Sequence, residues 1–255
     1  KEYPAPKKRV LGMGISMASG DLIVTTDADC TAGPGWLRSI AAYYDQTKNI
    51  FIAAPVKIKD GSSLLSKFQA LDFLTMQGIT AAAVFKHFHN MCNGANLAYT
   101  KKAFAEVSGF EGIDNIASGD DMLLMHKIQK VYPDKIGFIK STNVIVETQP
   151  ANSLSEFMNQ RVRWASKADR YTDPKIASVL LLVYFFNLWI FIAGICSFVS
   201  LNYFYLFILL LFVQTIVELF FLISFARFFV KQEFLFLFFP AQPFHIIFFL
   251  FACLV

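Results

Sequence analysis

Three long apolar segments occupy the C-terminal third of the chain. Residues 177–199 carry no formal charge, and residues 201–226 and 234–255 are nearly as apolar. As a helix, the first segment would span about 34 Å, slightly more than the roughly 30 Å hydrocarbon core of a bilayer. Buried helices of soluble proteins are seldom so long and so uniformly apolar, so the pattern predicts three transmembrane helices. Pro240 and Pro243 should kink the third helix or make it partly re-entrant.

Residues 1–176 show a different pattern, in which short apolar segments alternate with helical periodicity. Residues 22–26 are apolar and β-branched, as expected of a buried strand, and residues 36–44 place apolar side chains on one helical face. Further strand-like segments lie at residues 50–55, 96–99, 136–139 and 144–146. The alternation predicts an α/β domain with a largely parallel sheet. The chain therefore divides into a water-soluble domain, residues 1–176, and a membrane domain, residues 177–255.

One helical segment of the first domain has an amphipathic pattern. Within residues 62–79, polar side chains at Lys67, Gln69 and Asp72 accompany an apolar face that consists of Leu64, Leu65, Phe68, Leu71 and Met76. Such a helix could lie on a membrane surface or pack in the protein core. The sequence leaves both alternatives open.

The composition agrees with this division. The chain is 55% hydrophobic and 16% charged, whereas soluble domains usually carry about a quarter charged residues. The membrane domain contains four of the charged residues: Glu218, Arg227, Lys231 and Glu233. The net charge of +4 is spread among acidic residues rather than grouped in a basic stripe, which argues against nucleic acid as a partner.

Basic residues predict the orientation of the membrane domain. They lie before the first apolar segment and between the second and third, whereas the connection at residues 200–202 has none; these basic residues are Arg161, Arg163, Lys167, Arg170, Lys175, Arg227 and Lys231. Because basic residues stay on the cytoplasmic side, the soluble domain is predicted to be cytosolic. The pattern thus predicts a multi-pass protein of a plasma membrane, such as the bacterial inner membrane, in contact with membrane lipids.

Glu218 is unusual because it falls at membrane depth, where an ionisable side chain is costly and often functional. The favoured interpretation is structural: Gln214, one turn earlier, could hydrogen-bond to it in a contact between helices.

Two acidic pairs are candidates for chemistry. Asp27 and Asp29 follow a predicted strand, at the carboxyl end where open α/β sheets place ligands. Such carboxylates suit Mg²⁺ or Mn²⁺, and the ion would neutralise a diphosphate. Taken alone, a solvated acidic turn is the simpler interpretation. Asp120 and Asp121 precede a helical segment, where Ser118 as N-cap and Asp121 at the third helical position would form a loose capping box.

A second capping box, Ser153 with Glu156, should open a helix before the first apolar segment. Gln160, Arg163 and Trp164 then share one helical face. An amide, a guanidinium and an indole together suit a diphosphate and a sugar ring. The alternative is a juxtamembrane helix with basic residues at lipid headgroups.

The order of these features resembles the family-two inverting glycosyltransferases, and most closely their membrane-bound branch that includes cellulose and hyaluronan synthases. The resemblance covers residues 7–255 and follows the series Thr26-Asp27-Ala28-Asp29-Cys30, Asn93-Gly94-Ala95-Asn96, Gly119-Asp120-Asp121 and Gln160-x-x-Arg163-Trp164, followed by membrane spans. It implies a Rossmann-like glycosyltransferase A-type fold followed by transmembrane helices. Domains of this family begin with a strand and an acidic residue that hold the nucleotide base, and this sequence starts after them.

The resemblance also implies roles for the donor-binding residues. Asp27 and Asp29 match the Asp-x-Asp motif that contacts the nucleotide diphosphate and its Mg²⁺ or Mn²⁺, with Asp29 the more direct metal ligand. Asn93 and Gly94 match a stretch beneath the donor sugar.

In the same comparison, Asp120 and Asp121 match the acidic pair whose second carboxylate is the general base. Gln160, Arg163 and Trp164 match the motif that lines the donor diphosphate and the acceptor entrance.

The predicted function is therefore inverting transfer of a sugar from a nucleotide-diphosphate donor to a lipid or glycan acceptor, in glycolipid or cell-envelope polysaccharide synthesis. A metal-dependent nucleotidyl- or phosphotransferase would need the paired carboxylates but not the Gln-x-x-Arg-Trp face. A transporter or membrane scaffold would place more polar residues in the spans than Gln214 and Glu218.

Overall fold

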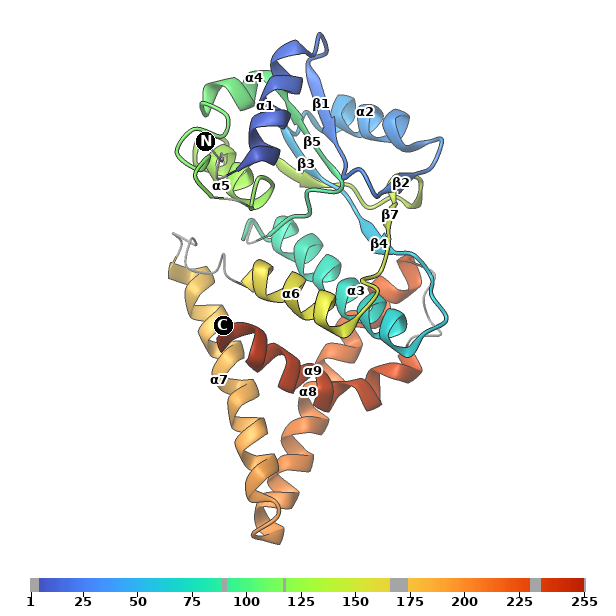
Figure 1. Cartoon of the computed structure of the whole chain (residues 1–255), viewed down its shortest axis with the longest axis vertical. Helices are drawn as coiled ribbons and strands as arrows, with labels where there is room; N and C mark the ends of the chain where they lie inside the picture. The colour runs from blue at the N-terminus through green and yellow to red at the C-terminus, as the bar shows by residue number, and fades with distance from the viewer. Residues whose placement is uncertain (1–4, 89–90, 117, 166–173, 230–234, 255) are drawn as a thin grey trace. The chain divides into compact units, whose positions relative to one another are not determined.

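A computed structural model describes residues 5–88, 91–116, 118–165, 174–229 and 235–254 (Figure 1). Four residues that entered the sequence analysis lie outside these ranges: Lys167, Arg170, Lys231 and Glu233. The chain forms two compact units. The first contains residues 1–59 and 79–149, and the second contains residues 60–78 and 150–255. This grouping by contacts differs from the division at residue 176 that composition suggests.

The first unit is built on a mixed sheet of four strands. The strands are β1 (Leu22–Thr25), β5 (Leu97–Thr100), β3 (Phe51–Ala53) and β6 (Ile136–Phe138), in that spatial order. The strand β5 runs antiparallel to both β1 and β3, and the pairing of β3 with β6 is parallel. The prediction of a largely parallel sheet is wrong in this respect, because β5 enters between β1 and β3 in the opposite direction.

A smaller sheet extends this unit. Its strands are β2 (Thr31–Ala32), β7 (Val146–Thr148) and β4 (Val56–Ile58), with β7 in the centre. Residues 144–146, predicted as a strand, instead contain the end of a 3₁₀ turn, η1 (Thr142–Val144), followed by the start of β7.

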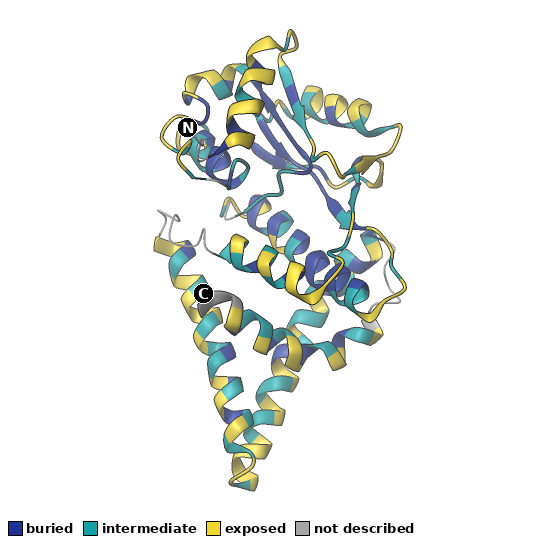
Figure 2. Ribbon diagram, viewed as in Figure 1, coloured by how far each residue is buried: buried dark blue, intermediate teal, exposed yellow. Residues whose placement is uncertain are grey.

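Helices cover both faces of the larger sheet. They are α1 (Pro6–Met17), α2 (Trp36–Thr47), α4 (Lys101–Glu106) and α5 (Met122–Val131). Successive strand residues point to opposite faces, so Phe51 joins the core with α5, whereas Ile52 joins the core with α2. Figure 2 shows β3 and β5 as buried, β1 at the edge as largely intermediate, and the outer faces of α1 and α2 as exposed. A sheet covered on both faces explains why its strands are continuous apolar runs.

The second unit consists of helices. They are the first part of α3 (Leu64–Phe85), then α6 (Leu154–Ala165), α7 (Pro174–Cys196), α8 (Leu201–Phe228) and α9 (Leu235–Leu254). Figure 1 shows α7 and α8 as a hairpin with α9 running across it. Among the described residues, α7 and α8 are long and apolar enough to cross a membrane. The third predicted span forms α9, whose apolar stretch Phe236–Phe251 is shorter.

The surfaces of α7 and α8 are apolar as well as exposed. Large side chains such as Leu182, Phe198 and Phe220 have 70%, 93% and 74% of their area exposed. Such a surface is unstable in water but suits lipid, so these helices associate the protein with a membrane.

The amphipathic helix α3 packs inside the protein within the second unit. Gln69 and Asp72, expected on its polar face, are buried there. The side chain of Gln69 donates to the carbonyl of Ala151 at 3.0 Å and accepts from the N–H of Ala151 at 2.8 Å. These bonds compensate for the loss of water.

Candidate functional site

The edge of the larger sheet brings distant polar residues together. Thr25, near the end of β1, is paired with Leu97, at the start of the antiparallel strand β5. Asp27 follows the first of these strands and Gly94 precedes the second, so both lie at the same edge. The sequence predicted Asp27 at a strand end, and the reversed direction of β5 adds Gly94 to it.

Asp121 connects this edge to helix α5. Its Oδ2 accepts from the backbone N–H of Gly94 at 2.9 Å, and its Oδ1 accepts from the N–H of Met122 at 2.7 Å. Asp121 is the N-cap of α5, in place of the predicted Ser118. A residue of this turn does cap the helix, as predicted, but the cap lies three residues later than expected. The bond from Gly94 holds Asp121 at the position where the helix begins.

Lys7, on helix α1, joins the two acidic pairs. Its Nζ lies 2.8 Å from Oδ1 of Asp27 and 3.1 Å from Oδ2 of Asp120. Partial burial lowers the pKa of Lys7, but the hydrogen bond to Asp27 and the charges of Asp120 and Asp27 outweigh this effect and raise it above its ordinary value. The carboxylates thus hold a positive charge at the edge of the sheet.

Sequence reasoning did not identify Lys7. The triplet Lys7-Lys8-Arg9 resembles an ordinary solvated helix start, and its distance of 20 residues from Asp27 gives no motif. The only available signal was that a lysine precedes the strand that carries the Asp-x-Asp sequence.

Lys8 fixes the loop that leads to the second acidic pair. It is 2% exposed, and its Nζ donates to the carbonyls of Ile113, Ile116 and Ser118 at 2.6, 2.8 and 3.0 Å. One buried ammonium therefore organises the segment just before Asp120.

Tyr99 is buried beneath the acidic cluster. Burial, the larger cause, and the charge of Asp120 raise the pKa of its hydroxyl.

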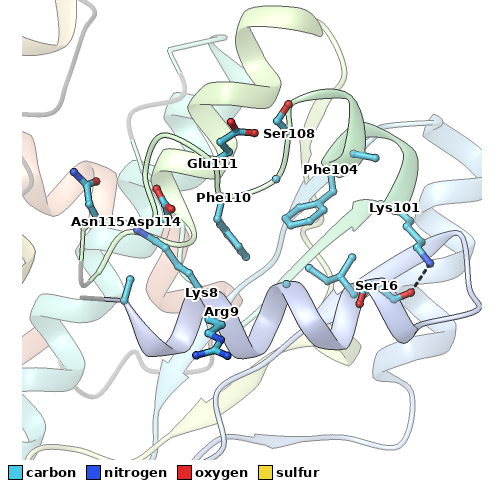
Figure 3. Close-up of a pocket in the computed structure, with 15 residues that line it drawn as sticks. Lys8, Arg9, Ser16, Lys101, Phe104, Ser108, Phe110, Glu111, Asp114 and Asn115 are labelled. Carbon is cyan, nitrogen blue, oxygen red and sulfur yellow. Dashed lines mark hydrogen bonds between the residues drawn. The ribbon is translucent and has the colours of Figure 1, made fainter. Parts of the chain in front are cut away.

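Two hollows lie near these residues. A small one, about 10 Å³, is lined by the acidic cluster and includes Lys7, Asp27, Gly94, Asp120 and Asp121. A larger cavity of about 740 Å³ lies between α1, α4 and the loop that follows α4, and Figure 3 shows Phe104 and Phe110 in it. None of the sequence-predicted site residues lines the larger cavity, whereas four of them, Asp27, Gly94, Asp120 and Asp121, line the smaller one.

Asp29 lies apart from the small hollow and is exposed. The thiol of Cys30 lies 3.6 Å from its Oδ1. Burial and the charges of Asp29 and Asp27 raise the pKa of Cys30, so the thiol stays protonated. Across the described residues, no three His, Cys, Asp or Glu side chains are grouped to hold a metal ion by themselves.

The asparagines of the Asn93–Asn96 stretch have structural contacts. The Oδ1 of Asn93 accepts from the N–H of Ala95 at 2.9 Å and closes a turn. Asn96 is fully buried, and it donates to the carbonyls of Pro55 and Val144 and accepts from the indole of Trp36. Of the two residues predicted beneath the donor sugar, only Gly94 contacts the acidic cluster.

Replacing Asn96 by alanine should destabilise the first unit by about 2–4 kcal/mol. The Val144 carbonyl and the indole N–H of Trp36 would lose their Asn96 partner, whereas the Pro55 carbonyl would keep the bond from the N–H of Val146 at 3.1 Å. Each group left unpaired costs about 1–3 kcal/mol, with partial relief by water. Chemical unfolding of the purified protein measures this loss. Replacing the exposed Asn152 by alanine is the matched control, and an Asn96 variant as stable as that control would contradict the prediction.

The helix α6 carries the remaining predicted residues. The capping box at its start is confirmed: the N–H of Glu156 donates to Ser153 Oγ at 3.1 Å, and the N–H of Asn152 donates to the Glu156 carboxylate at 2.9 Å. Along the helix, Gln160 is half-buried, Arg163 is exposed, and Trp164 packs on Phe73 with ring centres 6.2 Å apart. These three residues belong to the second compact unit, whereas the acidic cluster belongs to the first.

A mixed α/β domain with an acidic cluster at the sheet edge, followed by two apolar helices, is the arrangement of a membrane-associated glycosyltransferase of the A type. The chain belongs to glycosyl transferase family 21, which matches residues 4–255. The expected class is therefore confirmed, although the matched family is not the family-two branch that the motifs resemble.

A curated relative supports the same class. The chain is 22% identical over 100 residues to the glucosyl-dolichyl phosphate glucuronosyltransferase of Haloferax volcanii. The matched segment covers 38% of this chain and 32% of that relative. The chain thus spans about a third of the relative's length.

Proposed function

We propose that the protein is an inverting, metal-dependent glycosyltransferase that moves a sugar from a nucleotide diphosphate to a lipid-linked or glycan acceptor at the cytosolic membrane face. The observation that carries the proposal is the convergence of Asp27, Asp120 and Asp121 at one edge of the sheet around the ammonium of Lys7. The organisation shared with the family-two membrane synthases supports it. Neither a nucleotidyltransferase nor a scaffold accounts for the family membership.

The acidic residues fit a divalent cation. Asp27 already pairs with the ammonium of Lys7, and Asp29, two residues further along the chain, is exposed. Magnesium and manganese need few protein ligands when substrate phosphates and water complete the coordination, so two carboxylates suffice. Asp27 and Asp29 would hold Mg²⁺ or Mn²⁺ and Lys7 would adjust to the bound diphosphate. When bound, the ion supplies positive charge that stabilises the leaving diphosphate.

Asp121 is suited to accept the proton of the acceptor hydroxyl. In a single displacement, that oxygen bonds to the anomeric carbon as the bond from this carbon to the diphosphate oxygen breaks and its electron pair leaves with the diphosphate. The proton passes to an oxygen of Asp121. The N–H groups of Gly94 and Met122 hold this carboxylate in one orientation, which favours proton transfer at a fixed position.

Helix α6 offers groups for the donor and the acceptor. Arg163 is exposed, and its guanidinium can bind two diphosphate oxygens bidentately. Gln160 can donate a hydrogen bond, and the indole of Trp164 offers a face on which a sugar ring can stack. The acceptor class follows from two features: the apolar helices α7 and α8, and the lipid-linked sugar in the name of the Haloferax relative.

The orientation gives a prediction of its own. In a cysteine-free background, Asn202→Cys should react with a membrane-impermeant maleimide only from outside, and Lys175→Cys only from inside. The reason is that the basic residues lie on the side of Lys175, whereas the connection next to Asn202 is uncharged. Both positions are exposed. Labelling in the reverse sense would place the acidic cluster away from cytosolic donors and contradict the proposal.

The direct test is sugar transfer by the full-length protein in native membranes. Membranes would be incubated with radiolabelled sugar nucleotides, one at a time, with Mn²⁺ or Mg²⁺, and the lipid and polymer fractions counted. We expect the lipid fraction to gain label from one donor, and this gain to disappear with chelator and in Asp121→Asn membranes. Label that is absent from both fractions with every donor would contradict the proposal.

A further inference from the structure

A buried ion pair joins two helices of the second unit. Arg161 on α6 lies against Asp72 on α3, through Nη2 of the guanidinium and Oδ2 of the carboxylate, and the two side chains are 6% and 7% exposed. The Nε2 of His245 on α9 lies 3.3 Å from the other oxygen of Asp72. Burial raises the pKa of Asp72, but the charge of Arg161 and the hydrogen bond from His245 outweigh this effect and lower it. Asp72 is therefore ionised, and it forms an ion pair with Arg161.

Arg161 is one of the basic residues that predict the orientation of the membrane domain, and its side chain is buried. The guanidinium lies between two aromatic rings of its own helix, 4.9 Å from the centre of Phe157 and 4.3 Å from the centre of Trp164. Phe157 is itself fixed, because it stacks on Phe248 of α9 at 4.9 Å and is fully buried. The cation thus connects a rigid aromatic core to the indole of Trp164.

Stability alone does not explain this arrangement. Burying two charges costs several kcal/mol of desolvation, and apolar replacements of such pairs are often as stable. The Nε of Arg161 has no hydrogen-bond acceptor among the described residues, so the pair is not fully compensated. What the pair provides is geometry, because a planar guanidinium held by a carboxylate fixes any ring stacked on it.

The same pair is connected to the apolar helices. One turn before His245, Gln242 donates to Oε2 of Glu218 at 2.7 Å, and Gln214 donates to Oε1 of Glu218 at the same distance. The hydrogen bond from Gln214 that the sequence suggested is present, within α8, and the contact between helices comes from Gln242 of α9. Helix α9 therefore makes two polar contacts one turn apart, from Gln242 to Glu218 on α8 and from His245 to Asp72 on α3.

We propose that Asp72 and Arg161 are positioning residues that hold the indole of Trp164 in the orientation needed for sugar transfer. The inference rests on the proposed function, in which Trp164 faces donor or acceptor. Asp72 acts through Arg161, Arg161 acts through ring stacking, and His245 ties the carboxylate to α9. Neither charge needs to touch substrate.

The test uses the full-length protein in nanodiscs with Trp36→Phe and Trp189→Phe, which leaves Trp164 as the only tryptophan of the sequence given. In Asp72→Asn/Arg161→Met, we expect the acrylamide quenching constant of Trp164 to rise at least about twofold, because the indole loses its fixed partner. Turnover should fall about 10- to 100-fold, as misplaced groups commonly cause, with nucleotide-diphosphate affinity unchanged within about threefold. This double variant removes both charges together and so avoids an unpaired buried charge.

Arg161→Lys separates positioning from charge neutralisation. Lysine keeps a cation beside Asp72 but lacks a planar group for stacking, so the quenching constant should still rise and turnover should still fall. Lys102→Met, which removes an exposed cation of α4, is the matched control and should leave both unchanged. Full restoration by lysine, or unchanged quenching and turnover in the double variant, would overturn the inference. If the protein with its three native tryptophans transfers no sugar, the proposed function fails, and the quenching comparison still decides whether the pair holds the indole.

Discussion

Replacing Asp121 by asparagine should lower turnover by about 10² to 10⁴, the usual share of general-base catalysis, with donor affinity nearly unchanged. Asparagine remains a good N-cap, so α5 should still form. However, the amide has one oxygen where the carboxylate has two, so either Gly94 or Met122 loses its acceptor. That loss should cost about 1 kcal/mol of stability, far too little to unfold the domain.

The measurement is a steady-state rate at saturating donor, together with a melting curve of the same variant. Asp45→Asn, at an exposed carboxylate that pairs with Lys48 on the surface, is the matched control and should keep the parent rate. Turnover of the Asp121 variant within a few-fold of the parent would leave Asp121 with its capping role alone.

Asp29→Asn should weaken Mn²⁺-dependent binding of a nucleoside diphosphate by about 100-fold, equivalent to about 2.7 kcal/mol. The side chain is exposed, and its one described neighbour is a thiol at 3.6 Å, so the fold should tolerate the change. Asp27→Asn should weaken binding as well and should also release Lys7, which then keeps only Asp120.

Calorimetry of the full-length protein with and without Mn²⁺ tests this expectation. In the absence of metal, the Asp29 variant and the parent should bind equally weakly, because the lost interaction requires the ion. An Asp29 variant with parental affinity in the presence of Mn²⁺ would remove Asp29 from the site.

Features encoded over a few residues could be predicted from the sequence. The strand before Asp27 and the capping box of Ser153 and Glu156 were found because neighbouring residues determine them. The N-cap of α5 was misplaced because Ser118 and Asp121 are both good caps, and a bond from the distant Gly94 decides between them. The helices α7 and α8 were predicted with their approximate bounds, since uniform apolarity over such a length has few alternatives.

Features that depend on long-range packing could not be predicted. An apolar strand buried on both faces has the same pattern in either direction, so the antiparallel insertion of β5 left no trace. Nothing in the local sequence distinguishes Lys7 and Arg161 from other basic residues, because the carboxylates that pair with them lie far away in the chain. The contacts of these two residues, each within its own compact unit, therefore could not be predicted from the sequence.

The proposed mechanism is a single displacement with Asp121 as the base, and the anomeric configuration of the product tests it most directly. The labelled product would be released from native membranes within the first turnovers, and its anomeric proton coupling compared with that of the donor. We predict the opposite configuration to that of the donor, and no product in Asp121→Asn membranes over the same time. A product that retains the donor configuration would contradict the mechanism, because a single displacement from the side opposite the leaving diphosphate inverts the anomeric carbon.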